Sequence, residues 1–179
     1  MENPSSVALD LASRTDVPIL ANLLELYIHD ICDLFPKVEL GEDGRFGYPK
    51  LASYFGAAES GTNGGRFAYL IRHGGRLAGF ALATRGSPVS PDPAVFDVAE
   101  FFVVRKYRRL GVGYGAAALL WSAWPGTWTV RVSEGNMRGL GFWDSAIRRF
   151  AGEDVTVSTH PGAPHAWRVF SFATKASPG

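Results

Sequence analysis

The sequence predicts an α/β protein in which one mixed β-sheet carries helices on both faces. Strand-like and helix-like segments follow one another in the order β-α-α-β-β-β-α-β-α-β-β. The clearest of the expected helices gather their apolar residues on one face, which must be buried against another element. With 179 residues, of which 46% are hydrophobic and 20% charged, the chain is long enough for one sizeable core. We therefore expect a single domain over residues 1–179, with its core spanning about 7–173.

The N-terminal third opens with a weak apolar–polar alternation at 7–11, which predicts a short strand. A helix is expected from about Thr15 to Leu34, because apolar residues recur there at helical spacing. These residues are Leu20, Leu23, Tyr27, Ile31 and Leu34. The stretch 36–47 is rich in glycine and charge and predicts a loop, and apolar residues at 51–55 indicate a short second helix.

A β-hairpin is the best-defined element of the middle third. Apolar runs at 67–71 and 77–82 flank the Gly74-Gly75 step, and glycine accepts the positive φ angles of a tight turn. Beyond a proline-rich loop at 87–93, the remaining elements follow from their spacing. They are a strand at 95–104, a helix at 114–124, a strand at 127–132, a helix at 136–150, and strands at 155–159 and 167–173.

Composition excludes several classes of function. The formal net charge of +1 provides no overall attraction to nucleic acid or anionic membranes, so neither is expected as a partner. The one cysteine, Cys32, allows no intramolecular disulfide, and no apolar run is long enough to span a bilayer; both features suit a cytoplasmic protein. His160 and His165 lack acidic or cysteine partners at ligand spacing, so we expect no metal site. The oligomeric state is left open, with a homodimer as one alternative.

The segment 101–116 carries the most chemical information. An apolar strand ends there, four cations fall within five residues, two glycines follow, and a helix rich in small residues begins. A helix start leaves backbone N–H groups without internal partners and favours negative charge. Glycine at 111 and 113 removes side chains that would hold a phosphate away from those amides, and the cations add attraction for phosphate. The pattern predicts a site for a phosphorylated cofactor.

Two interpretations of this pattern follow from the residues alone. The first is a tight strand-to-helix turn with a solvated charged rim. The second is a dinucleotide site, because Gly111-x-Gly113-x-x-Ala116 fits the letters of that fingerprint. Six residues separate these glycines from the strand, however, and the position at which an acidic residue is expected lies near Arg131. No phosphate loop of the G-x-x-x-x-G-K-[S/T] type is present in the sequence.

The motif Phe101-x-Val103-x-x-x-Tyr107-Arg108-x-x-Gly111-x-Gly113 resembles the acetyl-CoA-binding motif of the GNAT superfamily of N-acyltransferases. A second match, Val132-x-x-x-Asn136 followed by Phe142-Trp143, resembles the strand, asparagine and helix that line the pantetheine arm in that family. The resemblance implies a GNAT-like fold and acetyl-CoA as co-substrate. It also implies transfer of the acetyl group to a primary amine of a small molecule or peptide, by direct attack in a ternary complex.

Carried over residue by residue, the resemblance assigns three roles. The Asn136 side chain would bind the pantetheine arm, although a helix N-cap is an equally natural role for asparagine. The backbone of Phe102, Val103 and Val104 would pair with the pantetheine amides. The diphosphate would be held next to Arg108 by main-chain amides of the following residues: Arg109, Leu110, Gly111, Val112, Gly113 and Tyr114.

The catalytic groups are less well defined. Glu100 is the first candidate for a general base, because apolar neighbours would raise its pKa, and Glu134 is a weaker alternative. Strict strand alternation places Asp97 on the face opposite to Glu100. Trp143 stands where a tyrosine protonates the departing thiolate in many relatives, and an indole cannot act as that acid. Tyr107 and Tyr114 are the remaining acid candidates. The missing tyrosine also supports a second hypothesis, a non-catalytic acyl-CoA-binding sensor of the same fold.

Overall fold

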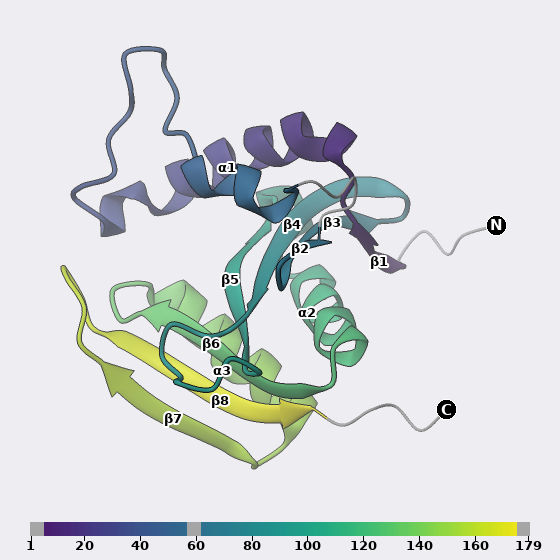
Figure 1. Cartoon of the computed structure of the whole chain (residues 1–179), viewed down its shortest axis with the longest axis vertical. Helices are drawn as coiled ribbons and strands as arrows, with labels where there is room; N and C mark the ends of the chain where they lie inside the picture. The colour runs from purple at the N-terminus through teal and green to yellow at the C-terminus, as the bar shows by residue number, and fades with distance from the viewer. Residues whose placement is uncertain (1–5, 57–61, 175–179) are drawn as a thin grey trace.

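A computed structural model of the chain describes residues 6–56 and 62–174, and within them eight strands form one mixed sheet (Figure 1). Their order across the sheet is β1-β3-β4-β5-β6-β8-β7, with β2 pairing to β3. The strands are β1 (Val7–Leu11), β2 (Thr62–Asn63), β3 (Arg66–His73), β4 (Arg76–Arg85), β5 (Phe96–Val103), β6 (Gly126–Ser133), β7 (Val155–His160) and β8 (Trp167–Thr174). The helices are α1 (Val17–Ile31), α2 (Val112–Ala123) and α3 (Met137–Ala151).

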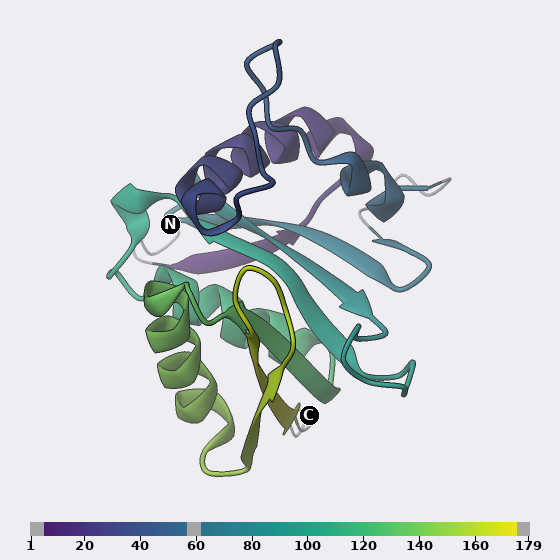
Figure 2. The same cartoon turned by 90° about the vertical axis from the view of Figure 1, so that its left-hand side faces the viewer.

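Helices cover both faces of this sheet, as the sequence predicts. Helix α1 lies across one face, and α2 and α3 lie on the other (Figures 1 and 2). Two separate apolar clusters reflect this arrangement. Leu20 and Leu24 of α1 pack with Phe80 and other residues from one face of the sheet. Helices α2 and α3 pack on the opposite face.

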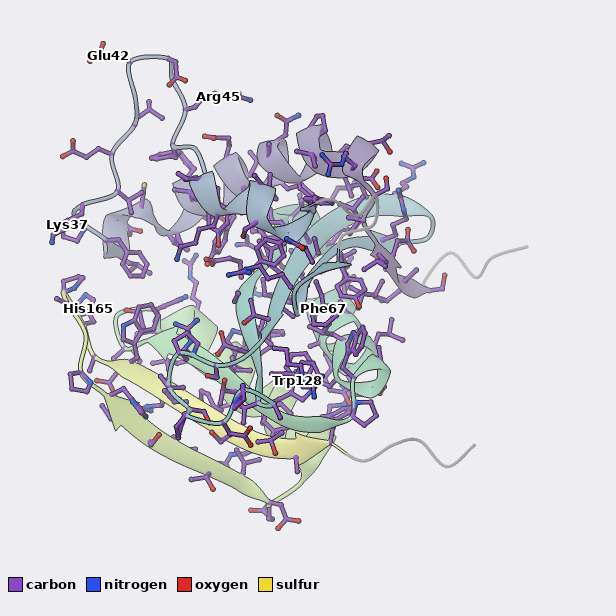
Figure 3. All side chains as sticks on the ribbon, in the orientation of Figure 1. Lys37, Glu42, Arg45, Phe67, Trp128 and His165 are labelled. Atoms are coloured by element: carbon purple, nitrogen blue, oxygen red, sulfur yellow. The ribbon has the colours of Figure 1, made fainter. Side chains whose placement is uncertain are left out.

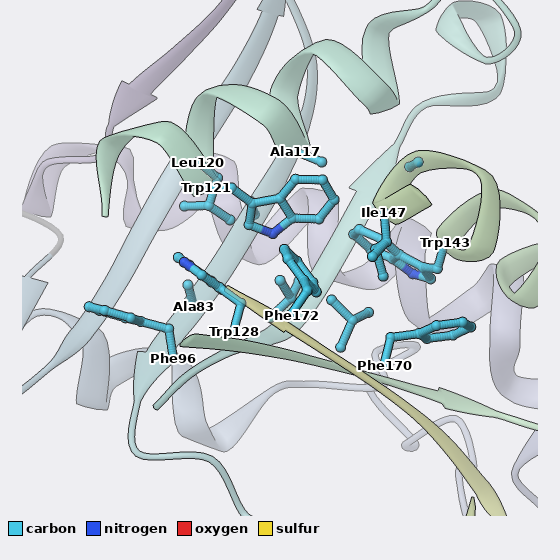
Figure 4. Packing of buried hydrophobic residues seen from close by; sticks show 14 of the residues in the cluster. Ala83, Phe96, Ala117, Leu120, Trp121, Trp128, Trp143, Ile147, Phe170 and Phe172 are labelled. Atoms are coloured by element: carbon cyan, nitrogen blue, oxygen red, sulfur yellow. The ribbon is translucent and has the colours of Figure 1, made fainter. Parts of the chain in front are cut away.

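The core beneath α2 and α3 is built from aromatic rings (Figure 4). Trp121 of α2 and Trp128 of β6 are fully buried. The ring of Trp128 stacks on Phe96 at 5.0 Å, and that of Trp121 meets Phe172 edge-on at the same centroid distance. Large rings in such geometry supply both apolar burial and directional contacts. This core fixes the positions of β5 and β6, the two strands that border the candidate site.

Strands β5 and β6 are parallel neighbours for only three residue pairs, from Phe96↔Trp128 to Val98↔Val130. Beyond Val98, β5 remains paired with β4, while β6 remains paired with β8. The two strands therefore part in the middle of the sheet and leave one edge of β5 open. The same place carries a register shift between β4 and β5, in which Ala99 has no partner. A bulge of this kind bends a strand and re-aims the side chains beyond it.

Most local elements agree with the sequence. The expected first helix is interrupted: a 3-10 turn at Arg14–Asp16 precedes α1 and another at Cys32–Leu34 follows it. The short second helix is a 3-10 helix, Pro49–Tyr54. The two-residue strand β2 has too few residues to show any periodicity.

The predicted hairpin is present, with longer strands than expected, and Gly74 and Gly75 have φ angles of 54° and 74°. Two consecutive positive φ angles are the requirement of the tight hairpin turn that this glycine pair predicts. No helix within residues 6–56 and 62–174 is both long and apolar enough to cross a membrane.

Candidate active site

The loop between β5 and α2 presents a row of open main-chain donors. Arg109 and Gly111 both have positive φ, 64° and 78°, so the chain turns sharply before α2 begins at Val112. None of the amides from 109 to 114 donates a hydrogen bond to another group within the described residues. Leu110 at the tip is 59% exposed, so the loop faces solvent rather than the core. The arrangement is an anion-binding geometry at the start of a 12-residue helix.

Two cations of this loop have a structural role besides the expected attraction for phosphate. Arg105 and Arg108 do not simply add positive charge: both form ion pairs with Asp30 near the end of α1. Burial acts to raise the pKa of Asp30, but the hydrogen bonds from Arg108 and Arg105 outweigh it and hold that pKa below its usual value. These pairs fasten α1 to the loop. Arg109 remains without an ion pair among the described residues.

A cavity of about 610 Å³ lies beside this loop. Its lining includes Gly113 of α2 and two arginines, Arg109 and Arg138, that form no ion pair within the part of the chain that the structure describes. Arg138 was not identified from the sequence, because an exposed arginine in the first turn of α3 looks like ordinary surface. The cavity therefore combines open amides, two available cations and a glycine at the point of closest approach.

The open edge of β5 borders the same cavity, which Phe102 and Val103 also line. Two of the groups predicted to pair with a ligand are already used within the chain. The Val104 amide donates to the carbonyl of Ala78 at 2.9 Å, and the Val103 carbonyl accepts from Nε of Arg108 at 2.7 Å. Of the main-chain groups of residues 102–104 that are predicted to pair with a ligand, these two are therefore not free to do so.

Asn136 caps α3. Its Oδ1 accepts a hydrogen bond from the Gly139 amide at 2.9 Å, which confirms the N-cap interpretation. A Cβ atom at position 139 would lie 2.5 Å from the Asn136 side chain, so a larger residue there would displace the capping amide. The helix continues from Met137 to Ala151 without a break, and the looseness that glycine could have introduced is not observed. A role for Asn136 in ligand binding stays a prediction.

A second cavity of about 560 Å³ adjoins the first. It lies between α1, the loop at 35–48, β5 and β6, and its lining contains Glu100 and Arg131. The two cavities share side chains from three elements, α1, β5 and α3 with its N-cap. The shared residues are Tyr27, Ile31, Phe101, Asn136 and Trp143. A molecule in one cavity would therefore contact the walls of the other.

Glu100 lies at the centre of this second cavity's polar surface. Tyr27 donates a hydrogen bond to its Oε2 at 2.7 Å, and Tyr48 donates one to its Oε1 at 3.0 Å. Burial raises the pKa of Glu100 above its ordinary value, against the two phenol hydrogen bonds and the charge of Arg131, which lower it. Burial and the neighbouring Glu100 charge raise the pKa values of Tyr27 and Tyr48, so both phenols stay protonated.

Tyr48 is held in place by the loop that carries it. Glu25 of α1 accepts hydrogen bonds from two successive loop amides, Phe46 at 2.7 Å and Gly47 at 2.9 Å. Two charge-assisted bonds from adjacent residues fix the orientation of the chain just before Tyr48. The loop is therefore docked on α1 at the point where it reaches the cavity.

Asp97 lies on the same face of β5 as Glu100, which corrects the expectation from strict alternation. The unpaired Ala99 adds one residue to the strand, and the side chains beyond it change faces. Asp97 is fully buried and pairs with Arg131 of β6 through Nε and Nη2, at 3.0 Å and 2.8 Å. It is therefore committed to an ion pair and is not a free base.

The other predicted catalytic residues lie away from the two cavities. Glu134 pairs with Arg168 at 3.2 Å and lines neither cavity. The ring of Tyr107 packs against His73, while Tyr114 stacks under the guanidinium of Arg149 at 3.9 Å. Trp143, by contrast, lines both cavities and is a buried ring that packs edge-on against Phe101.

Three polar residues of the second cavity, Tyr27, Tyr48 and Arg131, are not identified as functional from the sequence. Tyr27 was identified only as part of the apolar face of α1, and Tyr48 lies at the end of a loop without periodicity. In the sequence, Arg131 stands out only because a dinucleotide fingerprint requires an acidic residue near that position. The available signal was the amphipathic nature of tyrosine, which usually finds a hydrogen-bond partner when its ring is buried. Nothing local in the sequence identifies that partner as Glu100.

Comparison of the sequence with protein-family models and with curated proteins gives no match. Comparison of the structure with solved structures does. An acetyltransferase from Thermus thermophilus has a TM-score of 0.65 at 13% identity, over 97% of this chain and 100% of that one. A ribosomal L7/L12 α-N-protein acetyltransferase in complex with coenzyme A has a TM-score of 0.65 at 12% identity, over 96% of each chain.

A spermidine N-acetyltransferase from Vibrio cholerae, in complex with CoA and spermine, has a TM-score of 0.63 at 8% identity. The match covers 93% of this chain and 95% of that one. At such low identities the similarity establishes the fold, and it does so over nearly the whole chain. The fold is that of the GNAT acetyltransferases, as the two sequence motifs predicted.

Proposed function

We propose that this chain, which has the GNAT fold, is an acetyl-CoA-dependent N-acetyltransferase that acts on a primary amine in a ternary complex. One observation carries the proposal: a cavity bordered by unpaired amides meets a cavity that holds a buried carboxylate, and the two share a wall. Direct transfer needs such an arrangement, because donor and acceptor must be held together for attack. The single cysteine, Cys32, fits a cytoplasmic location for the reaction.

The cofactor side is suited to the diphosphate of coenzyme A. Amides of the six residues from 109 to 114 supply the donors, and the helix start adds a favourable electrostatic field. Arg109 and Arg138 supply the available positive charge. The open edge of β5 near Phe102 would receive the extended pantetheine arm, in the manner of an added strand. These residues bind and orient acetyl-CoA, which supplies the thioester.

The acceptor side supplies the proton chemistry. Glu100 would accept a proton from the attacking amine, directly or through water, and its raised pKa brings it nearer to neutrality than an ordinary carboxyl group. The nitrogen–carbon bond forms as the carbon–sulfur bond breaks. The sulfur then needs a proton, and Trp143 cannot donate one.

Tyr27 can relay that proton because it lines both cavities and is already hydrogen-bonded to Glu100. It would donate its hydroxyl proton to the departing sulfur while it recovers one from the protonated Glu100. The net transfer is from the amine to the thiolate, and no free phenolate forms. The raised pKa of Tyr27 would make an isolated tyrosine a poor acid. The relay avoids this difficulty, because Tyr27 gains a proton from Glu100 as it gives one to the sulfur.

Two measurements test the proposal. Calorimetry with acetyl-CoA, CoA and NADPH should detect binding of the first two and none of the third. Release of free thiol from acetyl-CoA, across a panel of amino acids, peptides, polyamines and aminoglycosides, should then detect turnover with at least one amine. Binding without release from any acceptor would favour the acyl-CoA sensor, and absence of CoA binding would refute both functions.

A further inference from the structure

The second cavity, which contains Glu100, is called the acceptor cavity from here on. Arg131 of β6 places a fixed guanidinium group in its wall. Its Nε and Nη2 atoms bind Asp97, which also accepts a hydrogen bond from Thr129 at 2.7 Å. Ser87 completes this buried network, in contact with the Thr129 hydroxyl at 2.7 Å. The Nη1 atom of Arg131 makes no hydrogen bond within residues 6–56 and 62–174. An arginine held in this way has donors left for a second planar anion.

A second unsatisfied polar group lies two residues along the same strand. The hydroxyl of Ser133 is buried, has no hydrogen-bond partner in the described part of the chain, and belongs to a residue that lines the same cavity. Residues 131 and 133 point to the same face of β6 because side chains alternate along a strand. Buried polar groups without partners are rare in folded proteins, and each calls for an explanation such as a bound molecule.

Aromatic side chains enclose this end of the cavity. Trp167 of β8 lies against the Arg131 guanidinium at 5.9 Å and stacks on Phe35 at 6.1 Å. That stacking joins the segment after α1 to the start of β8. Figure 3 shows the neighbours of these two rings, Lys37 and His165, on facing segments at the same side of the molecule. A low-dielectric surround strengthens any ion pair formed beside Arg131.

The charges of the cavity suit a zwitterion better than a polycation. Its lining carries three cationic side chains and two acidic ones, and one of the acids, Glu100, already binds two phenols. An amine placed at Glu100 would leave Arg131, on the neighbouring strand β6 and in the lining of the same cavity, for a negative group. The rest of the lining is largely apolar and includes Ile28, Ile31, Val38 and Phe46. An amine with several positive charges would meet too few carboxylates here.

We propose that the amine acceptor also carries a carboxylate, which Arg131 binds through its free Nη1 edge, and an apolar side chain next to these two groups. The acceptor class is thus apolar amino acids or their close relatives. The inference rests on the proposed function, since it assigns the amine to Glu100. It distinguishes this site from that of a polyamine acetyltransferase.

The test uses the full chain saturated with CoA and matched sets of probes. One set is L-leucine, L-leucinamide and isoamylamine; the other is L-phenylalanine, L-phenylalaninamide and phenethylamine; spermidine is added as a polycation. Calorimetry should show the carboxylate member of a set binding at least about tenfold more tightly than its amide. Arg131→Lys keeps the pair with Asp97 but loses the second edge, so the preference should fall severalfold. Asp97→Asn combined with Arg131→Gln should abolish it.

Two controls keep the result interpretable. Arg168→Gln removes a cation of β8 that lies outside the cavity and should preserve the carboxylate preference. The affinity for CoA reports whether each variant still folds. If the variant with both Asp97→Asn and Arg131→Gln does not fold, Arg131→Lys alone tests the inference. Equal or tighter binding of the amides or of spermidine, or no carboxylate binding at millimolar concentration, would overturn this inference. That result would leave acetyl-CoA binding and amine turnover unaffected. Those two measurements test the proposed function, so it can hold or fail independently of this inference.

Discussion

The two adjoining cavities form one cleft, with a cofactor side and an acceptor side, and these two sides are built in different ways. On the cofactor side, the largest group of lining residues comes from one segment, in and after β5, and the principal donors are main-chain amides of that segment. The acceptor side draws single side chains from widely separated elements: Tyr27 from α1, Tyr48 from a loop, Glu100 from β5 and Arg131 from β6. Its chemistry exists only once the chain has folded.

This difference predicts how each side responds to substitution. A main-chain donor persists when its own side chain changes, so the cofactor side should tolerate most side-chain truncations and fail only when the backbone is blocked. The two arginines tied to Asp30 illustrate the point, since the loop keeps its open amides although Asp30 offsets one of these two charges. The acceptor side should respond strongly to single side chains. The predictions that follow challenge this contrast.

The largest effect is expected at Glu100. Glu100→Gln keeps the shape of the side chain and removes the base, so turnover should fall by about 10²–10⁴-fold, the usual contribution of a general base. The affinity for acetyl-CoA should not change, because no cofactor contact is lost. Glu134→Gln, which alters the other predicted candidate, should leave turnover intact because Glu134 pairs with Arg168 outside the cavities. Unaltered turnover of Glu100→Gln at all pH values would remove this residue from the mechanism.

On the cofactor side, only a change that reaches the backbone should have a comparable effect. A Cβ atom at Gly113 would lie 3.0 Å from the ring of Phe142, so Gly113→Val must displace that ring and cover the first amides of α2. Loss of two charge-assisted hydrogen bonds, at about 1.5–3 kcal/mol each, predicts at least about 100-fold weaker acetyl-CoA binding.

The matched control for Gly113→Val is Gly141→Ala on α3, where an added Cβ meets nothing within 4 Å. It should bind acetyl-CoA normally. Thermal melting of both variants separates loss of binding from loss of fold. A Gly113→Val protein that is folded and binds acetyl-CoA with unchanged affinity would show that the amides of 109–114 do not hold the cofactor.

A smaller effect is expected from the phenols around Glu100, and its sign follows from the hydrogen bonds. Both phenols donate to the carboxylate and so stabilise its charged form. Tyr48→Phe removes one bond, and the pKa of Glu100, already raised by burial, should rise further. The acid limb of the kcat/KM profile should then move to higher pH by about one unit. A shift of one pKa unit corresponds to a loss of about 1.4 kcal/mol in the stabilisation of the charged carboxylate.

Tyr54→Phe is the control for this shift. Tyr54 is buried near Glu100 but donates no hydrogen bond to it within the described residues, so its acid limb should stay near that of the unmodified chain. Tyr27→Phe should shift the limb as Tyr48→Phe does and also lower the plateau of kcat, because the relay to sulfur is lost. An equal effect of Tyr27→Phe and Tyr48→Phe at every pH would exclude the relay.

The same contrast explains how far the sequence could be read. The glycine loop, the strand before it and the helix after it are local patterns, and the fold class and most elements followed from such patterns. Glu100 was found because it lies next to the motif. The bulge at Ala99 was not predictable from alternation alone, and it brings Asp97 to the same face as Glu100. The position of Tyr48 depends on the bonds that Glu25 accepts from the loop residues before it, and that of Arg131 depends on Asp97. No local spacing encodes these tertiary contacts.

The smallest effects should come from the cations of the cofactor cavity. Arg109→Ala and Arg138→Ala each remove one exposed charge, and exposed charges contribute about 0.2–1 kcal/mol, so KM for acetyl-CoA should rise only about two- to fivefold. Salt should weaken this contribution, because exposed charges are screened over about 8–10 Å at physiological ionic strength. Arg45→Ala, at the tip of the loop after α1 (Figure 3), is the control and should change neither KM nor its salt dependence. If either arginine instead proved as important as Gly113, the cofactor would be held by side chains, and the contrast between the two sides of the cleft would be wrong.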